Sequence, residues 1–114
     1  MSKEEEVRYR LVLSVECNDW QGKFTYQDFE ILVNEAIKSI LGLLFVIFNA
    51  TFQLFKQGEL KDVEITDFDS STKLGSIVVN KSDLNSIWAA LCIYSVHFTK
   101  RVAIRVKKSS IDYH

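Results

Sequence analysis

Residues 63–79 read VEITDFDSSTKLGSIVV, and this stretch predicts a β-hairpin. Val63–Phe68 forms a short strand with alternate apolar residues on one face. Asp69–Lys73 supplies the turn, and Leu74–Val79 supplies the second strand. The segments on either side of this hairpin then decide the architecture that contains it.

Upstream of the hairpin the sequence predicts one strand and one helix. Arg8–Cys17 alternates between an apolar face and a mostly polar face, which is the pattern of a half-buried strand. Thr25 and Asp28 have the spacing of a capping box at the start of a helix. After them, apolar residues recur at helical spacing: Phe29, Leu32, Val33, Ala36, Ile37 and Ile40.

Downstream of the hairpin the sequence predicts a second helix and a closing strand. Ser82 is placed to cap this helix, and Lys100–Lys108 alternates again as a strand before the polar tail Ser109–His114. The apolar residues of the second helix are Leu84, Ile87, Trp88, Leu91 and Cys92.

The order strand, helix, strand, strand, helix, strand predicts an α+β fold, the ferredoxin-like βαββαβ sandwich, which resembles an RNA-recognition-motif domain. Four antiparallel strands carry two helices on one face, and the first and last strands are neighbours. We expect a single domain over residues 1–114, with an ordered core at about 8–108 and polar tails. Residues expected to be buried are Tyr9, Leu11, Leu13, Val15, Ile104 and Val106.

The composition excludes several classes of protein. Hydrophobic residues make up 47% of the chain and charged residues 25%, which argues against disorder. The net charge of −1 excludes a protein that coats nucleic acid by bulk charge. Met1–Glu6 lacks the basic flank and apolar core of a signal peptide, so we expect an intracellular, unprocessed protein.

The sequence contains no known catalytic motif, so we expect no catalytic residue, no metal and no cofactor. His97 is interpreted as a partly buried residue near the end of the second helix. Cys17 and Cys92 are interpreted as packed small hydrophobic residues rather than a redox pair. Asp67 and Asp69 are candidates for a shared metal, although a solvated hairpin turn is favoured.

Basic residues concentrate near the C-terminus. Residues 84–114 hold 5 basic and 1 acidic side chains, whereas residues 1–83 hold 9 basic and 14 acidic ones. Period two places five cations on one outer sheet face if the first and last strands are neighbours: Arg8, Arg10, Arg101, Arg105 and Lys107. Lys100 and Lys108 lie at the ends of the last strand. The candidate RNA-binding residues are Arg8, Arg10, Lys100, Arg101, Arg105, Lys107 and Lys108. The alternative is an edge strand whose charges only prevent aggregation.

The third strand argues against base stacking on the sheet. Residues 73–80 read KLGSIVVN and contain no aromatic side chain, whereas RNA-recognition motifs stack bases on aromatic residues there. Any RNA contact of the basic face should therefore be to the backbone rather than to base identity.

Ile40–Phe55 is apolar almost all round, and its part Leu43–Phe55 is too aromatic to remain exposed to water on so small a domain. We expect it to continue the first helix over the core or to pack against a partner subunit. A membrane span is disfavoured because a span needs about 20 apolar residues, and this shorter run contains polar side chains. Its candidate partner-interface residues are Phe45, Phe48, Phe52 and Phe55.

Several stretches resemble the small protein subunits of nuclear and archaeal ribonuclease P. Tyr9–Leu13 and the helix Phe29–Leu41 are similar to the family's first strand and helix. Leu74–Val79 followed by Ile87–Leu91, with its tryptophan, resembles the third strand and next helix. Lys100–Val106 is similar to the closing strand, and the length is nearest to the fourteen-kilodalton branch of the family.

This resemblance implies a non-catalytic subunit of an RNA-based enzyme that removes 5′ leaders from precursor transfer RNA. The implied partners are ribonuclease P RNA, a related small subunit of the same fold and a thirty-kilodalton barrel-shaped subunit, with no membrane. The implied location is the nucleus and nucleolus, and a related mitochondrial-RNA-processing particle shares several subunits. Leu43–Phe55 departs from the family pattern because it is longer and more apolar.

The main alternative is a ferredoxin-like adaptor that joins proteins without direct RNA contact. Salt-dependent RNA affinity separates the two interpretations, because only phosphate contacts produce a strong salt slope. A membrane-attached protein and an independent enzyme are weaker alternatives on the observations above.

Overall fold

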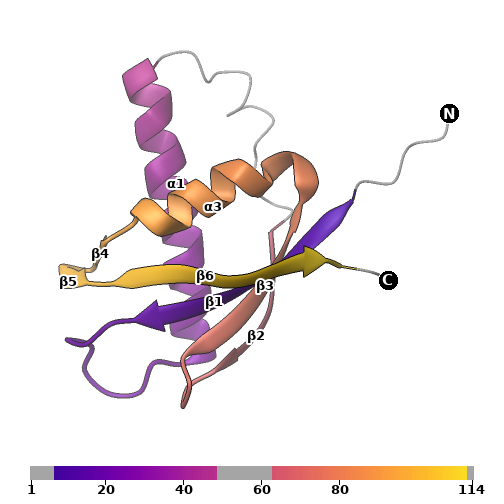
Figure 1. Ribbon diagram of the computed structural model, residues 1–114. Coiled ribbons are helices and arrows are strands. Elements are labelled where there is room, and N and C mark those ends of the chain that lie inside the picture. Colours follow the sequence, from indigo (N-terminus) through magenta and orange to yellow (C-terminus); the bar gives the residue numbers. More distant parts are fainter. Residues whose placement is uncertain (1–6, 49–62, 113–114) are drawn as a thin grey trace, which may run out of the picture.

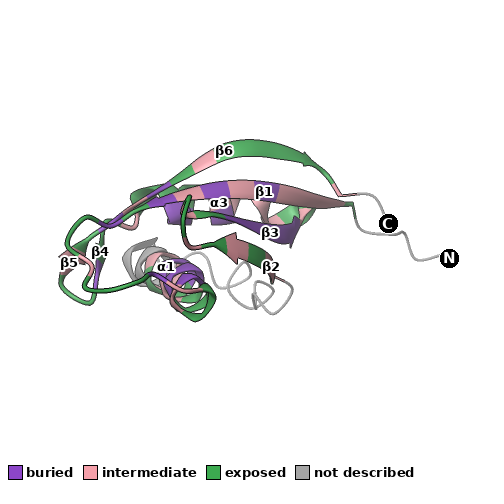
Figure 2. Ribbon diagram, turned by 90° about the horizontal axis from the view of Figure 1, so that it is seen from below, coloured by how far each residue is buried: buried purple, intermediate pink, exposed green. Residues whose placement is uncertain are grey.

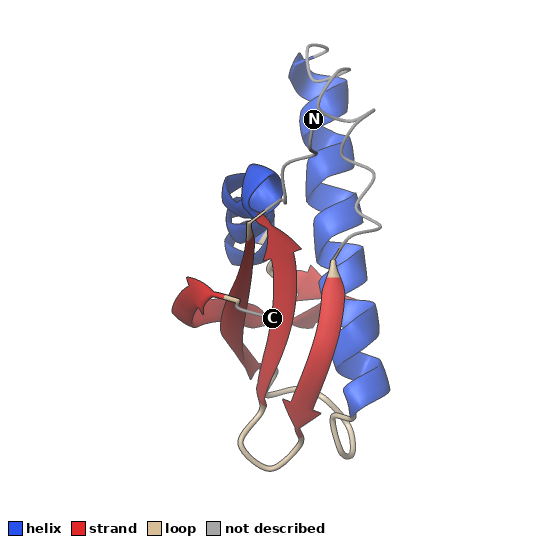
Figure 3. Ribbon diagram, turned by 90° about the vertical axis from the view of Figure 1, so that its right-hand side faces the viewer, coloured by secondary structure: helices blue, strands red, loops and turns tan. Residues whose placement is uncertain are grey.

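The computed structural model describes residues 7–48 and 63–112. These residues form a four-stranded antiparallel sheet with two helices behind it, as Figures 1 and 3 show. The predicted βαββαβ ferredoxin-like arrangement is therefore confirmed. The elements are β1 (Arg8–Glu16), α1 (Tyr26–Phe48), β2 (Glu64–Asp69), β3 (Leu74–Asn80), the 3₁₀ turn η1 (Lys81–Asp83), α3 (Leu84–Ile93), β4 (Val96–His97), β5 (Lys100–Arg101) and β6 (Ala103–Ile111).

The strand order in the sheet is β2-β3-β1-β6, so the first strand pairs with the last, as predicted. β1 is antiparallel to both of its neighbours. Leu11 lies opposite Ile77 of β3, and Leu13 lies opposite Val106 of β6. This register places alternate residues of the sheet under the two helices.

The core lies between the inner face of the sheet and α1 and α3 (Figure 2). Four of the six residues that we expected to be buried are so, with exposed fractions of 3% or less: Leu11, Leu13, Val15 and Ile104. Tyr9 and Val106 are only partly buried, which corrects the prediction for these two. Tyr9 pairs with the exposed Ile111, and Val106 lies on an edge strand, so each has neighbours on fewer sides.

The start of α1 follows directly from its capping box. The Thr25 N–H donates to Asp28 Oδ2 at 2.9 Å, and the Asp28 N–H donates to Thr25 Oγ1 at 3.2 Å. These reciprocal bonds satisfy two amides that the first turn leaves without helical partners. α1 then continues to Phe48, so the predicted extension of the first helix is confirmed as far as that residue.

The start of the second helix differs from the prediction. Ser82 lies inside η1, and α3 begins at Leu84 with no side-chain cap at Asp83. The Lys81 N–H donates to the Val7 carbonyl at 2.8 Å and extends the sheet pairing past β3. The chain therefore makes a 3₁₀ turn before the α-helix can begin.

The predicted closing strand Lys100–Lys108 is divided at Val102. The Val102 N–H donates to the Ser95 carbonyl at 3.0 Å, so this residue leaves the ladder. β5 pairs with β4 in a separate two-stranded hairpin, and β6 alone joins the main sheet. β6 continues to Ile111, into the segment that we interpreted as a polar tail.

Candidate nucleic-acid interface

The helices cover one face of the sheet and leave the outer face open (Figures 2 and 3). In the four strands of this sheet the aromatic residues are Tyr9 and Phe68, and both pack against the core. The outer face of the described strands thus offers no ring on which a base could stack. Its chemistry is that of charged and hydroxyl side chains.

A β-bulge on β6 changes which cations share the outer face. Ser14 of β1 lies opposite Arg105, but Val12 lies opposite Lys108, so Lys107 is an extra residue without a partner on β1. We expected Arg105 and Lys107 to share the outer face by simple alternation, and the bulge corrects this. Lys108 takes the outward position that we assigned to Lys107.

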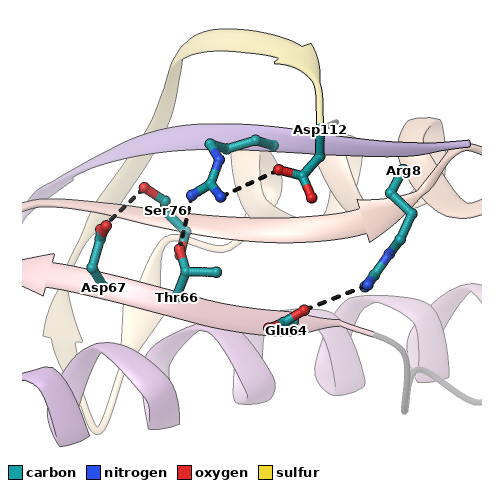
Figure 4. A network of polar contacts seen from close by, with 7 residues as sticks. Arg8, Glu64, Thr66, Asp67, Ser76 and Asp112 are labelled. Carbon is teal, nitrogen blue, oxygen red and sulfur yellow. Dashed lines mark hydrogen bonds and ion pairs between the residues drawn. The ribbon is translucent and has the colours of Figure 1, made fainter. Parts of the chain in front are cut away.

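The arginines of β1 are bound by acidic residues on neighbouring segments, as the close view in Figure 4 shows. Arg8 Nη1 lies 3.4 Å from Glu64 Oε1 on β2. Arg10 Nη2 lies 3.2 Å from Asp112 Oδ1, just after β6, and the Asp112 side chain is only 14% exposed. Both β1 arginines therefore have an acidic partner within the protein, but only the Arg10 pair is shielded, because the Glu64 side chain that pairs with Arg8 is 59% exposed.

Hydroxyl groups extend this network across β2 and β3. Arg10 Nη1 donates to Thr66 Oγ1 at 3.2 Å, and the Thr66 hydroxyl donates to the Ser76 carbonyl at 3.1 Å. The Ser76 hydroxyl donates to Asp67 Oδ1 at 3.0 Å. Val78, between these groups on the outer face, is only 2% exposed. This part of the face is a packed polar layer that joins β1, β2 and β3 to Asp112, just after β6.

The cations of β5 and β6 behave differently. Within residues 7–48 and 63–112, no ion pair involves Lys100, Arg101, Lys107 or Lys108. Arg105 Nη1 lies 2.8 Å from Glu16 Oε1, but the two side chains are 59% and 54% exposed, so this pair is solvated and weak. We call these five cations the basic edge, because β6 is the last strand of the sheet and β5 leads into it.

The prediction that five cations share one sheet face is therefore wrong in detail. Arg8, Arg10 and Arg105 lie on the outer face, whereas Arg101 and Lys100 lie on the separate β4–β5 hairpin and Lys107 occupies the bulge. Lys108 joins the outer face instead. The seven candidates divide into a neutralised pair on β1 and the basic edge.

The β4–β5 hairpin also holds an exposed aromatic residue that the sequence analysis missed. Phe98 is 62% exposed, and both Phe98 and Thr99 have positive φ, at 51° and 67°. The hairpin protrudes beyond the end of the main sheet (Figures 1 and 2). The available signal was the apolar–polar alternation of Val96–Lys100, which is too short to stand out beside a helix.

His97 lies in β4, not in the second helix, and it is almost fully buried at 1% exposure. The hydroxyl of Tyr94 lies 2.8 Å from its Nδ1, and Trp20 stacks on its ring at a centroid distance of 6.1 Å. Burial lowers the pKa of the His97 imidazole, and the negative charges of Glu35 and Asp28 partly oppose this shift. His97 is thus the buried residue of the hairpin, and it packs against Tyr94 and Trp20.

The two cysteines and the hairpin aspartate Asp69 are the other groups that the sequence offered as reactive. Cys17 is buried, as predicted, and burial raises the pKa of its thiol. Cys92 is exposed, which corrects the prediction that it packs, because the buried stripe of α3 consists of other residues. Asp69 accepts hydrogen bonds from the Ser71 hydroxyl and amide, both at 2.9 Å, and these bonds lower the pKa of its carboxyl group.

The predicted partner interface falls mostly outside what the structure describes. Phe45 and Phe48 belong to the last turns of α1, and Phe52 and Phe55 lie outside the described residues. These four positions stay a prediction. None of the described helices is long and apolar enough to cross a membrane.

No protein-family model matches the chain, and no curated protein matches its sequence. A chain in the cryo-electron microscopy structure of yeast ribonuclease MRP is similar in structure, with a TM-score of 0.53 and 16% sequence identity. The similarity covers 96% of this chain and 77% of that chain. The protein therefore shares its fold, over nearly its whole length, with a chain of the yeast ribonuclease MRP structure.

Proposed function

We propose that the chain is a non-catalytic protein subunit of a ribonucleoprotein of the ribonuclease P type, which supports removal of 5′ leaders from precursor transfer RNA. The observation that carries this proposal is a fold match over 96% of the chain to a chain of yeast ribonuclease MRP. The strand and helix patterns that resemble small ribonuclease P subunits support it independently. Its proposed partners are the particle RNA, a related small subunit and the thirty-kilodalton subunit, in the nucleus and nucleolus.

The charge distribution supports RNA contact along the basic edge rather than over the whole sheet. Arg8 and Arg10 are held by Glu64 and Asp112, so a phosphate would have to displace an existing partner. A phosphate would displace no ion-pair partner from the cations of β5 and β6, apart from the solvated pair at Arg105. We therefore propose that the basic edge holds phosphates and that Arg8 and Arg10 chiefly join strands.

The charge-balanced outer face favours one other function, that of an adaptor between proteins. A polar layer with internal ion pairs is electrostatically more complementary to a protein surface of mixed charge than to a phosphate backbone. The adaptor would act through this face and through the phenylalanines of residues 45–55, without touching RNA. Both functions are compatible with membership in a ribonucleoprotein, and the salt dependence of RNA affinity separates them.

Recovery of the particle from cells tests the proposal. In one experiment the tagged chain is purified from its own cells and the RNA that copurifies is sequenced. In a second experiment the chain is depleted from the cells and precursor transfer RNA is measured. We expect ribonuclease P RNA, or the related ribonuclease MRP RNA, and we expect precursor transfer RNA with 5′ leaders to accumulate on depletion. The purified chain alone should cleave no precursor. Unchanged precursor levels after complete depletion, with no particle RNA recovered, would exclude the proposed function.

A charge variant with a matched control tests the basic edge itself. Lys107→Gln with Lys108→Gln removes two exposed cations, whereas Lys23→Gln with Lys38→Gln removes two exposed cations from elsewhere on the chain. The first pair should recover less particle RNA than the parent, and the second pair should recover the same amount. Equal recovery by both pairs would favour the adaptor.

A further inference from the structure

We propose that the β4–β5 hairpin binds single-stranded RNA, with the Phe98 ring stacked on an unpaired base and Lys100 and Arg101 holding the adjoining phosphates. This inference rests on the proposed function, and it specifies the kind of RNA that the protein contacts. Three observations support it: the conformation of the turn, the exposure of the ring and the charge around it.

The turn uses residues that its backbone disfavours. His97 pairs with Lys100, so Phe98 and Thr99 form a two-residue turn, and both have positive φ, at 51° and 67°. Turns of this kind favour Asn-Gly, because a side chain with a bulky or branched Cβ is strained in the left-handed region. Residues in a strained backbone conformation reduce stability, and they are often found at sites that bind a partner or ligand.

The Phe98 ring is supported on the protein side and open to solvent. Its centroid lies 4.3 Å from that of the His97 ring, with the two planes tilted by 40°. His97 is buried and stacks in turn on Trp20, so the support beneath Phe98 is rigid. Phe98 is nevertheless 62% exposed, more than a core residue of this size allows. The β4–β5 hairpin lies at one end of the described structure (Figure 1), and its Phe98 ring is both supported by the protein and exposed to solvent.

The charge beside the ring suits an RNA backbone. Lys100 and Arg101 follow the turn directly, and no ion pair involves either of them in the described part of the chain. β6 then continues the same basic edge to Lys108. An aromatic ring next to unpaired cations is the arrangement by which proteins hold unstacked bases and their phosphates. A duplex does not fit it, because its bases already stack on one another.

A protein partner fits the hairpin less well. A stable protein interface needs roughly 800 Å² on each partner, with an apolar centre. The large exposed apolar side chains at this end of the described structure are Ile93, Val96 and Phe98, and basic residues follow them directly in β5. The patch is too small and too charged for that role, which leaves RNA as the favoured occupant.

The decisive variant should gain stability while it loses RNA affinity. Phe98→Asn with Thr99→Gly installs the preferred turn, so the melting temperature of the full chain should rise. The same variant should bind a single-stranded RNA of about 12 nucleotides at least about fivefold more weakly, because base–aromatic stacking is lost. Thr99→Gly alone is the matched control, since it relieves strain and keeps the ring, and Phe98→Tyr should retain affinity.

Salt dependence and a duplex probe separate stacking from charge. The turn variant should keep the salt slope of the parent, whereas Lys100→Gln with Arg101→Gln should lower it by about 0.7 for each lost phosphate contact. A duplex of the same sequence should bind more weakly than the single strand, and the turn variant should not change that binding.

The outcomes distinguish this inference from the proposed function. If the turn variant bound the single strand as tightly as the parent but still recovered particle RNA, the hairpin site would be refuted and the proposed function would stand. If the turn variant lost a protein partner and kept its RNA affinity, the hairpin would be a protein contact. If the parent recovered no particle RNA, the proposed function would fail, and this inference would fail with it.

Discussion

Gly75 is the position at which a single methyl group should damage the fold most clearly. It lies on the inner face of β3, opposite Leu13 of β1 and Phe68 of β2, and beneath Phe29 of α1. A Cβ added there would lie 2.6 Å from Phe29 Cζ and 2.9 Å from the carbonyl oxygen of Asp67. Both distances are well inside van der Waals contact, so we choose Gly75→Ala as the perturbation.

The surroundings of Gly75 leave little room for relaxation. The Phe29 side chain is fully buried and stacks on Phe68 at a centroid distance of 4.7 Å, so its ring cannot swing aside. The Asp67 carbonyl belongs to β2 and moves only with that strand. Overpacking of this kind costs about 1–3 kcal/mol of unfolding free energy. For a domain of this size each kcal/mol lowers the melting temperature by about 4–8 °C.

Thermal unfolding followed by circular dichroism measures the effect. Gly42→Ala is the matched control, because Gly42 lies inside α1 and an added Cβ there meets no atom within 4 Å. Alanine is favoured over glycine inside a helix by about 0.5–1 kcal/mol, so the control should raise the melting temperature. The same chemical change is thus expected to have opposite signs at the two glycines.

A melting temperature for Gly75→Ala equal to or above that of the parent would refute the packing of α1 on β3. A second variant sharpens the result. Phe29→Leu removes the ring atoms that the new methyl group would meet, so Gly75→Ala should cost less in the Phe29→Leu background than in the parent. If Gly75→Ala lowered the melting temperature equally in both backgrounds, the clash with the Phe29 ring would not be the cause of the destabilisation.

Three further predictions follow from the same structure. Burial lowers the pKa of His97 below its ordinary 6.5, so on acidification the unfolded chain binds a proton at a higher pH than the folded chain does. The contribution of neutral His97 to stability should therefore be full above about pH 6.5 and decrease as the pH falls below it. The urea midpoint of the parent should be lower at pH 5.5 than at pH 7.5, and His97→Gln should show a much smaller difference. Thr25→Ala removes the capping bonds with Asp28 and should cost about 1 kcal/mol in urea unfolding, and an unchanged midpoint would contradict the observed cap. Lys107→Gln with Lys108→Gln should leave the melting temperature unchanged while lowering the salt slope of single-stranded RNA binding by about 0.7 per lost contact, so a large drop in stability would assign these lysines a structural role.

The local pattern of the sequence was enough to predict the type and order of the main elements. Residues 8–17 alternate and the apolar residues from Phe29 onward recur at helical spacing, because one side of each element faces the core. Such a pattern can be read from residues that are close in the sequence. The capping box at Thr25 and Asp28 is local as well, and it was predicted for the same reason. The pairing of the first and last strands followed from the element order.

Features that depend on register or on a single backbone bond were not predictable. The bulge at Lys107 shifts the alternation of β6 by one residue, and nothing in the sequence around it marks the extra position. The bond from Val102 to Ser95 divides the closing strand and creates the hairpin that carries Phe98. Both features depend on pairing between segments that are distant in the sequence or on one backbone bond, so only the folded chain specifies them.

The charge of the candidate site was decided by tertiary structure alone. The sequence determined that Arg8 and Arg10 point away from the core, because period two assigns each residue of a strand to a face. It did not determine that Glu64, 56 residues after Arg8, and Asp112, 102 residues after Arg10, would neutralise them. A strand's own periodicity sets the direction of its side chains, whereas the partner of each charge is set by the strands that fold against it. That physical difference divides the seven candidate RNA-binding cations into a neutralised pair and a basic edge.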